Sequence, residues 1–173
     1  METFYCVRVP IDQNETYKLD NMTHHIHHHE VSRYTPKQLY ELVADITQYP
    51  QFLPWCKGAR ITQRLSDTQC KAELVIAFKG ITERYSSLVT LTPAETEQQP
   101  FHILAELIDG PFEELRNEWT FLPTPENGTD IQLNLAFQFK SKMLDALIGG
   151  LFGKASEKMI SAFRQRARDL YGT

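Results

Sequence analysis

The segment DIQLNLAFQFK, residues 130–140, decides the fold class because its side chains alternate between apolar and polar character. The apolar positions are Ile131, Leu133, Leu135, Phe137 and Phe139, and the positions between them are polar except for Ala136. Successive side chains of a β-strand point to opposite faces of a sheet. This period of two therefore predicts a strand with one buried face and one solvated face, as antiparallel sheets allow.

Five segments that precede this strand repeat the alternation. They are residues 59–65, 70–80, 81–93, 101–110 and 112–123. Each is bounded by Gly, Pro, Asp or Asn, which favour turns. The Asn-Gly pair at 127–128 predicts a hairpin between the last two strands. Short connections imply that consecutive strands are antiparallel neighbours, and a weaker alternation over 24–34 is consistent with one more strand at the start.

Residues 35–46 carry the signals of a helix N-terminus. Thr35 suits the N-cap, Pro36 suits the first helical position, and Gln38 completes a capping box. The expected buried face of this helix consists of Leu39, Leu42, Val43 and Ile46. We expect Pro50 to end the helix, because the residue before a proline avoids helical geometry.

A second helical pattern occupies the C-terminal part of the chain. Its apolar stripe from residue 156 to 171 consists of Met159, Ile160, Phe163, Ala167, Leu170 and Tyr171, and Gly172 follows it. The preceding residues 142–154 have the same stripe, but Gly149, Gly150 and Gly153 interrupt it. This interruption predicts either a kink or a separate short helix.

The order of these elements predicts an α+β fold in which a curved antiparallel sheet grips a long C-terminal helix. An apolar sheet face needs a cover, and the last helix is the only expected element long enough to cross it. Such packing often leaves a space where a small molecule can bind.

The segment YPQFLPWC, residues 49–56, combines two prolines with large apolar side chains: Tyr49, Phe52, Leu53 and Trp55. The prolines restrict the backbone at a low entropic cost. One interpretation is a hydrophobic plug that closes one end of the sheet. The other is a semi-rigid lip that guards a cavity mouth or touches a membrane, since Trp and Tyr combine an apolar body with a polar edge.

Length and composition limit the classes of protein to which the chain can belong. A chain of 173 residues can form one domain with a substantial core. Its net charge of −4 gives no general attraction to nucleic acid or anionic lipid. The longest apolar run is far shorter than the roughly 20 residues of a membrane span. Three cysteines without a CxxC spacing predict reduced thiols in a cytosol.

Residues 1–21 have neither a basic start nor an apolar core, and their acidic residues argue against a mitochondrial presequence. We expect them to form a poorly ordered or atypical N-terminal extension, and we expect residues 22–173 to form the folded domain.

Two clusters of polar residues on the predicted strands invite a chemical interpretation. His25, His27 and His29 would share one face of a strand, about 7 Å apart, a spacing that could bind a transition metal. No Cys or Asp accompanies them at ligand spacing, so we favour an exposed edge strand and predict no metal site. Glu114, Arg116 and Glu118 share a strand face, and a cross-strand charge ladder explains them better than an acid–base pair.

No nucleophile motif is present, and residues 148–156 lack the first glycine and the Ser or Thr of a phosphate loop. The residues alone therefore predict neither catalysis nor nucleotide binding. A local basic strip on the C-terminal helix consists of Lys154, Lys158, Arg164, Arg166 and Arg168. It could meet lipid headgroups or RNA phosphates, although an ordinary solvated helix face is the simpler interpretation.

The segment LYELVADITQYPQFLPWCKGARI, residues 39–61, resembles the signature of the coenzyme Q-binding START-like family. That family is grouped with bacterial ribosome association toxins and was once labelled oligoketide cyclases. Residues 107–121, 133–144 and 162–172 also resemble it, so the similarity covers about residues 22–172.

The resemblance implies a helix-grip fold, START-like or Bet v 1-like, with a hydrophobic tunnel that holds ubiquinone and performs no covalent catalysis. The implied function is a carrier or chaperone that supports respiratory electron transport or quinone biosynthesis, without a catalytic cofactor. The alternative is a ribosome association toxin that binds the large ribosomal subunit and blocks subunit joining. A cyclase acting in the same cavity is the least favoured option.

We expect a cytoplasmic bacterial protein that can touch the inner membrane transiently and does not bind DNA. The residues expected to line the ligand site are Phe52, Leu53, Trp55, Phe78, Tyr85, Phe112, Trp119, Phe137, Leu144, Leu147, Phe152 and Phe163. Tyr85 and Arg116 are the candidates for polar contacts with a quinone head.

Overall fold

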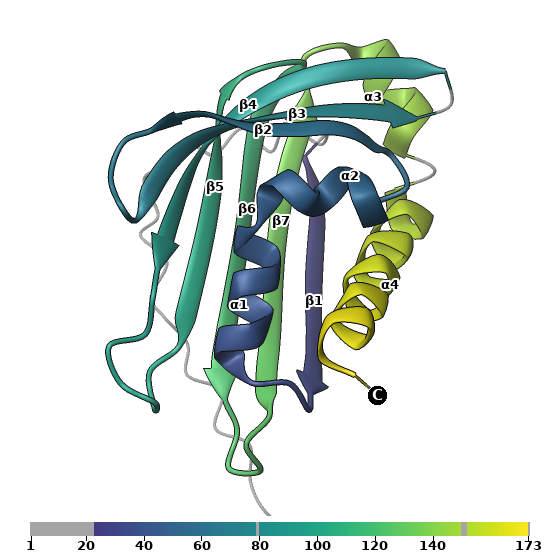
Figure 1. The fold of residues 1–173 in the computed structure, drawn as a ribbon. Coiled ribbons are helices and arrows are strands. Elements are labelled where there is room, and N and C mark those ends of the chain that lie inside the picture. The colour runs from purple at the N-terminus through teal and green to yellow at the C-terminus, as the bar shows by residue number, and fades with distance from the viewer. Residues whose placement is uncertain (1–22, 79, 150–151, 173) are drawn as a thin grey trace, which may run out of the picture.

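The computed structural model describes residues 23–78, 80–149 and 152–172 (Figure 1). The expected N-terminal extension 1–21 lies outside the described residues.

Within the described residues, seven antiparallel strands form one sheet in the order β1-β7-β6-β5-β4-β3-β2. The strands are β1 (His24–Ser32), β2 (Cys56–Arg64), β3 (Gln69–Phe78), β4 (Ile81–Thr92), β5 (Phe101–Asp109), β6 (Phe112–Pro123) and β7 (Thr129–Phe139). From β2 to β7 each strand pairs with its sequence neighbour, and the last strand, β7, also pairs with the first strand, β1. The alternating segments thus form the predicted antiparallel sheet, and the hairpin at Asn127–Gly128 joins β6 to β7.

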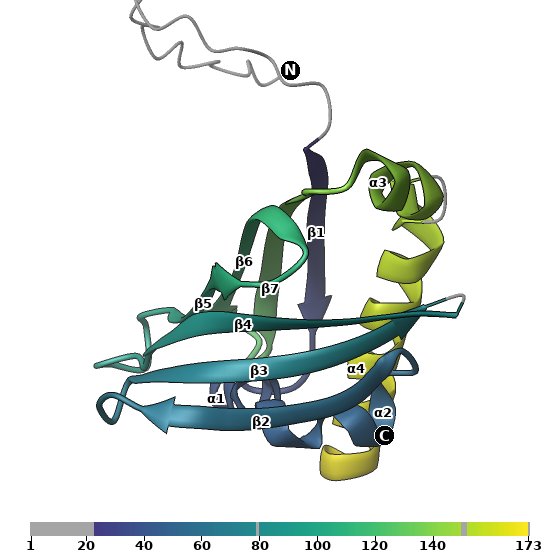
Figure 2. The same ribbon diagram turned by 90° about the horizontal axis from the view of Figure 1, so that it is seen from above.

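The sheet bends around the helices. Its strand pairs shift register at four places: between Cys56 and Gly58, between Ile61 and Gln63, between Ser86 and Ser87, and between Phe112 and Glu114. An extra residue in one strand of a pair bends that strand and increases its twist. Figures 1 and 2 show the result, in which β2, β3 and β4 curl away from the other strands over the helical side.

Helix α1 (Pro36–Ala44) begins as predicted, because Thr35 caps it and Gln38 completes the capping box. The expectation for Pro50 is wrong. Helix α1 ends at Ala44, and Asp45 leaves the helical region with φ −81 and ψ 66. A 3₁₀ turn, η1 (Ile46–Gln48), follows, and Pro50 lies in the first turn of α2 (Tyr49–Phe52), where a proline needs no backbone N–H.

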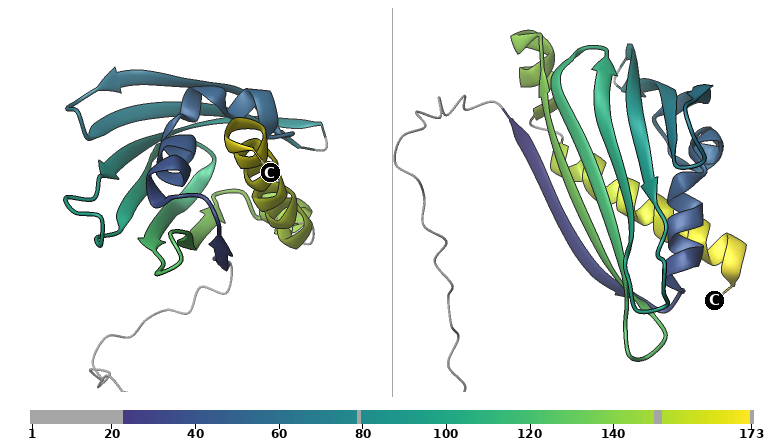
Figure 3. Two further views of the ribbon diagram at one scale, coloured as in Figure 1. Left: turned by 60° about the horizontal axis from the view of Figure 1, so that its bottom comes forward. Right: turned by 90° about the vertical axis from the view of Figure 1, so that its left-hand side faces the viewer.

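The C-terminal part contains two helices, α3 (Lys142–Gly149) and α4 (Phe152–Tyr171). Of the two predicted outcomes, the separate short helix is therefore the observed one. The longer helix α4 runs obliquely across the concave face of the sheet (Figure 3) and ends before Gly172, which has φ +86. None of the described helices is both long and apolar enough to cross a membrane.

Two groups of buried side chains fill the space between the sheet and the helices. The larger group joins the predicted face of α1 and η1 (Leu39, Leu42, Val43, Ile46) to the strands and to Ile160 and Ala167 of α4. The smaller group lies at the other end and contains Phe112, Phe137, Phe139 and Leu144. The core is thus divided into two parts.

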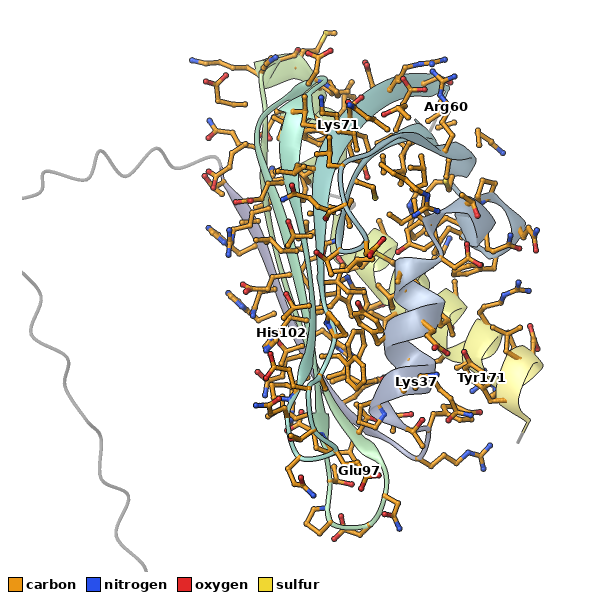
Figure 4. All side chains as sticks on the ribbon, turned by 60° about the vertical axis from the view of Figure 1, so that its left-hand side comes forward. Lys37, Arg60, Lys71, Glu97, His102 and Tyr171 are labelled. Carbon is orange, nitrogen blue, oxygen red and sulfur yellow. The ribbon has the colours of Figure 1, made fainter. Side chains whose placement is uncertain are left out.

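The convex face carries a ladder of charged side chains on β5 and β6. Arg116 pairs with Glu106 at 2.9 Å and with Glu118 at 3.6 Å, as expected for a cross-strand charge ladder. Figure 4 shows His102 on this outer face, whereas Lys37 and Tyr171 lie on the helical side.

The histidine-rich strand β1 lies at one edge of the sheet, and the side chains of His25, His27 and His29 are exposed on it. His29 contacts Asp130 of the neighbouring strand at 2.7 Å, and the rings of His25 and His27 stack 6.2 Å apart. Within the described part of the chain, no group of three or more His, Cys, Asp or Glu side chains is arranged to hold a metal ion.

Candidate ligand-binding cavity

A cavity of about 230 Å³ lies between the concave face of the sheet and α4. Strands β1 and β3–β7, the segment from α1 to Trp55, and the N-terminal half of α4 all contribute to its wall. The lining residues are Ile26, Val43, Ile46, Tyr49, Trp55, Ala72, Leu74, Ile76, Tyr85, Ser87, Val89, Ile103, Ala105, Phe112, Leu115, Asn117, Trp119, Leu135, Phe137, Phe139, Ala155, Ser156 and Met159.

The cavity exists because small residues meet at the centre of the concave face. Ala72 of β3 pairs with Ser87 of β4, and Ala105 of β5 pairs with Val89 of β4. Helix α4 also contributes two small residues to the cavity wall, Ala155 and Ser156. Interiors are otherwise close-packed, so short side chains on both layers leave a space that Leu or Phe at the same positions would fill.

Aromatic rings close the cavity at the end near α3. Phe112 contacts Tyr85 edge-on at a centroid distance of 5.4 Å and stacks on Phe139 at 4.7 Å. Phe137 adds a third contact with Phe112 at 5.9 Å, and Leu144 of α3 belongs to the same cluster. Edge-to-face and offset contacts of this kind stabilise aromatic clusters beyond simple burial, so this wall is well defined.

The segment from Tyr49 to Trp55 contributes both to the cavity wall and to the packed core. Tyr49 and Trp55 line the cavity, and the carbonyl of Trp55 accepts a hydrogen bond from the amide of Ala77 at 2.8 Å. Phe52 instead packs against Phe163 of α4 at 5.2 Å, and the Leu53 side chain is buried. The segment therefore supplies one edge of the cavity and also plugs the adjacent core.

The polar side chains among the described lining residues are all uncharged. The Tyr49 hydroxyl donates a hydrogen bond of 2.6 Å to the carbonyl of Val43. Burial raises the pKa of both Tyr49 and Tyr85, so both phenols stay neutral in the physiological range. The Ser87 hydroxyl and the Asn117 side-chain oxygen are buried and have no hydrogen-bond partner among the described residues.

A second cavity of about 410 Å³ lies between β1, α1 and α4. Val43 and Trp119 line both cavities, so these two side chains form the partition between them. The rim of the second cavity is charged: Arg164 of α4 forms an ion pair with Glu30 of β1, and His28 contacts the same carboxylate at 3.1 Å.

The residues expected from the sequence to contact a ligand fall into three groups. Trp55, Tyr85, Phe112, Trp119 and Phe137 line the first cavity. Phe52, Leu53, Leu144 and Phe163 lie nearby in the packed core, and Phe163 also lines the second cavity. Leu147 does neither, because α3 is a separate helix and leaves this side chain 53% exposed.

The three remaining candidates are Phe78, Phe152 and Arg116. The side chains of Phe78 and Phe152 lie outside the described residues. Arg116 cannot reach a ligand in the cavity, because it pairs with Glu106 and Glu118 on the convex face. Along β6 it lies between Leu115 and Asn117, which both line the cavity, so its alternation places it on the outside.

The cavity wall also contains small and polar residues that were not among the predicted site residues, among them Ala72, Ser87, Ala105 and Asn117. The alternation could have found them, since Asn117 lies two residues before Trp119 and Ser87 lies two residues before the buried Val89. The predicted site residues all have large side chains, whereas small residues such as Ala72 and Ala105 create the space.

Comparison with known proteins gives a family match over most of the chain. The model of the family described as polyketide cyclase / dehydrase and lipid transport matches residues 32–164. The chain is 43% identical over 143 residues to a protein from Rickettsia prowazekii named ribosome association toxin RatA, covering 83% of this chain and 95% of that protein. It is 31% identical over 143 residues to the mitochondrial coenzyme Q-binding protein COQ10 of Drosophila melanogaster, covering 80% of this chain and 56% of that protein.

Solved structures support the fold alone. The Zhui aromatase/cyclase from Streptomyces sp. R1128 superposes with a TM-score of 0.70 at 15% identity, covering 86% of this chain and 96% of that chain. Human StAR-related lipid transfer protein 5 gives a TM-score of 0.72 at 11% identity, covering 85% of this chain and 76% of that chain. The predicted helix-grip, START-like fold is thereby confirmed.

Proposed function

The chain belongs to the polyketide cyclase / dehydrase and lipid transport family, and on that premise we propose that it binds ubiquinone without catalysing a reaction. The bound quinone would be carried or presented to enzymes of respiratory electron transport or quinone biosynthesis. The observation that carries this proposal is the cavity of about 230 Å³ with apolar and uncharged walls.

A ubiquinone molecule needs a carrier outside the membrane because its polyprenyl tail is poorly soluble in water. A polyprenyl tail exposes much apolar surface, and its transfer from water gains roughly 25 cal/mol per Å². Ligand cavities for drug-sized molecules usually measure about 300–1,000 Å³. The cavity between sheet and α4 is smaller, so it would hold the quinone ring and the start of the tail, and the remaining tail would extend beyond it.

The side chains in the cavity wall support binding over catalysis. Cyclisation or dehydration needs groups that exchange protons near neutral pH. The described lining contains only Ser, Asn, Tyr and Trp as polar side chains, and burial raises the pKa of Tyr49 and Tyr85 away from neutrality. We place the carrier in the bacterial cytoplasm, with transient contact to the inner membrane during loading.

The test is the chemical identity of the co-purified ligand. The protein is purified from a ubiquinone-producing bacterium, extracted with organic solvent and analysed by mass spectrometry. We expect close to one ubiquinone per chain. An empty cavity in protein from that host would contradict the proposal.

A matched pair of variants connects the ligand to the cavity. Ala105→Leu fills the hollow at the centre of the concave face, and Ala136→Leu adds the same atoms opposite Arg116 on the convex face. We expect loss of the bound quinone in Ala105→Leu and wild-type occupancy in Ala136→Leu.

Association with the large ribosomal subunit is the second candidate function. It is favoured by the 43% identity to a protein named as a ribosome association toxin. Helix α4 presents the exposed cations Lys154, Lys158 and Arg168, which could contact rRNA phosphates. Arg164 and Arg166 are less available, because Arg164 pairs with Glu30 and Arg166 lies over the Phe52 ring.

Co-sedimentation separates the two candidates. If the chain binds ribosomes through these cations, it sediments with large subunits at low salt and is released as the salt concentration rises. The double variant Lys154→Glu/Lys158→Glu should then stay in the supernatant while its ubiquinone content is unchanged. Sedimentation of this variant at wild-type levels would remove these residues from the interface.

A further inference from the structure

We propose that Ser87 and Asn117 form a headgroup site for an uncharged ligand group that carries two hydrogen-bonding substituents. This inference rests on the proposed function, and it adds which part of the ligand lies deepest and which headgroups the cavity rejects.

The first observation is the pair of unsatisfied polar atoms. Ser87 is only 3% exposed, and both its hydroxyl oxygen and the Asn117 side-chain oxygen lack a hydrogen-bond partner among the described residues. Buried polar groups in folded proteins are nearly always paired, because an unpaired one has lost its water without replacement. Both residues line the cavity, so a ligand group can supply the missing bonds.

The second observation is the spacing of the two residues across the sheet. Ser87 lies on β4 and Asn117 on β6, and β5 runs between them with Ala105 paired to Asn117. Ser87 lies opposite Leu107 of β5 and not opposite Ala105, so two strand spacings and two residues along the strand separate it from Asn117, about 12 Å at the backbone. One hydroxyl group cannot bond to both side chains over that distance, whereas a ring with polar substituents on opposite sides can.

The third observation is the absence of charge. The described lining of the cavity contains no Asp, Glu, Lys, Arg or His. A carboxylate or phosphate placed there would lose its hydration without gaining a counter-ion, which is strongly unfavourable. The headgroup is therefore neutral, and fatty acids and phospholipids are poor ligands.

The hydrogen-bonding groups of Ser87 and Asn117 can serve both redox states of a quinone. A serine hydroxyl and an asparagine amide can each donate or accept a hydrogen bond, and the two ends of an amide can exchange by a flip. The same pair can thus serve two carbonyl groups, as in a quinone, or two hydroxyl groups, as in the corresponding quinol.

The test compares three probes of similar apolar length by titration of the tryptophan fluorescence: decylubiquinone, dodecane and dodecanoate at pH 8. Wild-type protein should bind decylubiquinone at least 10-fold more tightly than dodecanoate. Ser87→Ala and Asn117→Leu should each weaken decylubiquinone binding about 5- to 10-fold and leave dodecane binding unchanged. Ser86→Ala is the matched control, since Ser86 pairs with Glu73 of the convex face.

The outcomes distinguish this site from the proposed function. If wild-type protein binds neither decylubiquinone nor dodecane, the cavity is not a lipid site and the proposed function fails. If it binds both probes but Ser87→Ala and Asn117→Leu bind decylubiquinone like wild type, the headgroup site alone is wrong. Dodecanoate binding as tight as that of decylubiquinone would overturn the exclusion of charged heads.

A stability measurement guards against variants that simply fail to fold. Removal of an unsatisfied buried hydroxyl group should leave the ligand-free Ser87→Ala protein as stable as wild type or more stable. We expect its melting temperature to match or exceed that of wild type without ligand, and to rise less when decylubiquinone is added. A lower ligand-free melting temperature would mean that the hydroxyl stabilises the empty protein, which contradicts the site.

Discussion

Gly110, between β5 and β6, shows how closely the backbone packs behind the cavity wall. It has φ +147, and a β-carbon at this position would lie 2.5 Å from the β-carbon of Tyr85 and 3.0 Å from its α-carbon. Tyr85 lines the cavity, so a side chain here would displace the wall. We expect Gly110→Ala to lower the free energy of unfolding by about 2 kcal/mol or more and to weaken quinone binding.

Gly80 provides the control for this effect. It also has a positive φ, +83, but a β-carbon added here would meet no described atom of the surrounding structure within 4 Å. Gly80→Ala should therefore cost only about 1 kcal/mol of backbone strain and leave ligand binding unchanged. Urea unfolding of both variants tests the difference, and equal losses would mean that contact with Tyr85 contributes nothing.

Glu30 on β1 is the residue for which the structure gives a pH dependence. Burial by itself raises the pKa of this carboxyl, but hydrogen bonds from Arg164 and His28 outweigh burial and lower the pKa overall. A group with a lowered pKa in the folded state stabilises the protein above its unfolded pKa, about 4.3 for Glu, and loses that contribution as the pH falls.

We therefore expect Glu30→Gln to be less stable than wild type by about 1 kcal/mol at pH 7, a modest value because Arg164 is half exposed. The difference should shrink as the pH falls below about 4.3, the pKa of Glu in the unfolded chain, and on through the lower pKa of folded Glu30. Urea unfolding at pH 7 and pH 3.5 measures it, and a difference that stays constant between the two would show that the charge of Glu30 is irrelevant.

At the scale of the elements, Phe163 joins the long helix to the rest of the molecule. Its ring lies 5.2 Å from Phe52, 5.5 Å from Tyr49 and 5.3 Å from Trp119. One side chain of α4 thus contacts both α2 and the sheet. Phe163→Ala should lower the free energy of unfolding by about 3 kcal/mol, because it removes these ring contacts and leaves a void.

Leu170, on the same helix and 49% exposed, is the control, and Leu170→Ala should cost less than about 0.5 kcal/mol. Chemical denaturation of both variants provides the comparison. A loss in Phe163→Ala no larger than that in Leu170→Ala would mean that α4 is held by other contacts.

The elements differ in how well the sequence predicted them. Alternation predicted the strands because the polar face and the apolar face of an antiparallel sheet are both visible in the sequence. The capping box predicted the start of α1 because it is a local interaction. The end of α1 was predicted wrongly from Pro50, because a proline fits both the end of one helix and the first turn of the next. The chain leaves the helix at Asp45, where the sequence contains neither a glycine nor a proline to mark the end.

The cavity was harder to predict than the fold. Large side chains such as Trp55, Phe112 and Trp119 were expected in its wall, and the structure places them there. The hollow itself depends on what is missing at Ala72, Ser87 and Ala105, and on the register that brings these positions together across three strands. The alternation within a strand does not determine its register with the next strand, and a register shift between Ser86 and Ser87 changes the pairing of β4 with β5, so this part required the structure.

At the scale of the whole molecule, the cavity beside α4 and the charged-rim cavity between β1, α1 and α4 meet at Val43 and Trp119. The first has uncharged walls, and the second opens beside the ion pair of Arg164 with Glu30. Together they follow the sheet from the aromatic cluster of Phe112 to the end of β1. A ring held at Ser87 and Asn117 would therefore direct its tail either past Trp55 to solvent or past Trp119 into the second cavity.

Variants of the partition decide between these two paths. Val43→Ala shortens one of the two shared side chains and should join the cavities at a cost of about 2 kcal/mol. If the tail passes Trp119, quinones with longer tails gain affinity in this variant while decylubiquinone changes little. Phe121→Leu is the control, because Phe121 lines only the second cavity and its shortening widens that cavity without opening the partition. Binding of a series of quinones with increasing tail length measures the effect, and an identical length dependence in wild type and Val43→Ala would direct the tail past Trp55 instead.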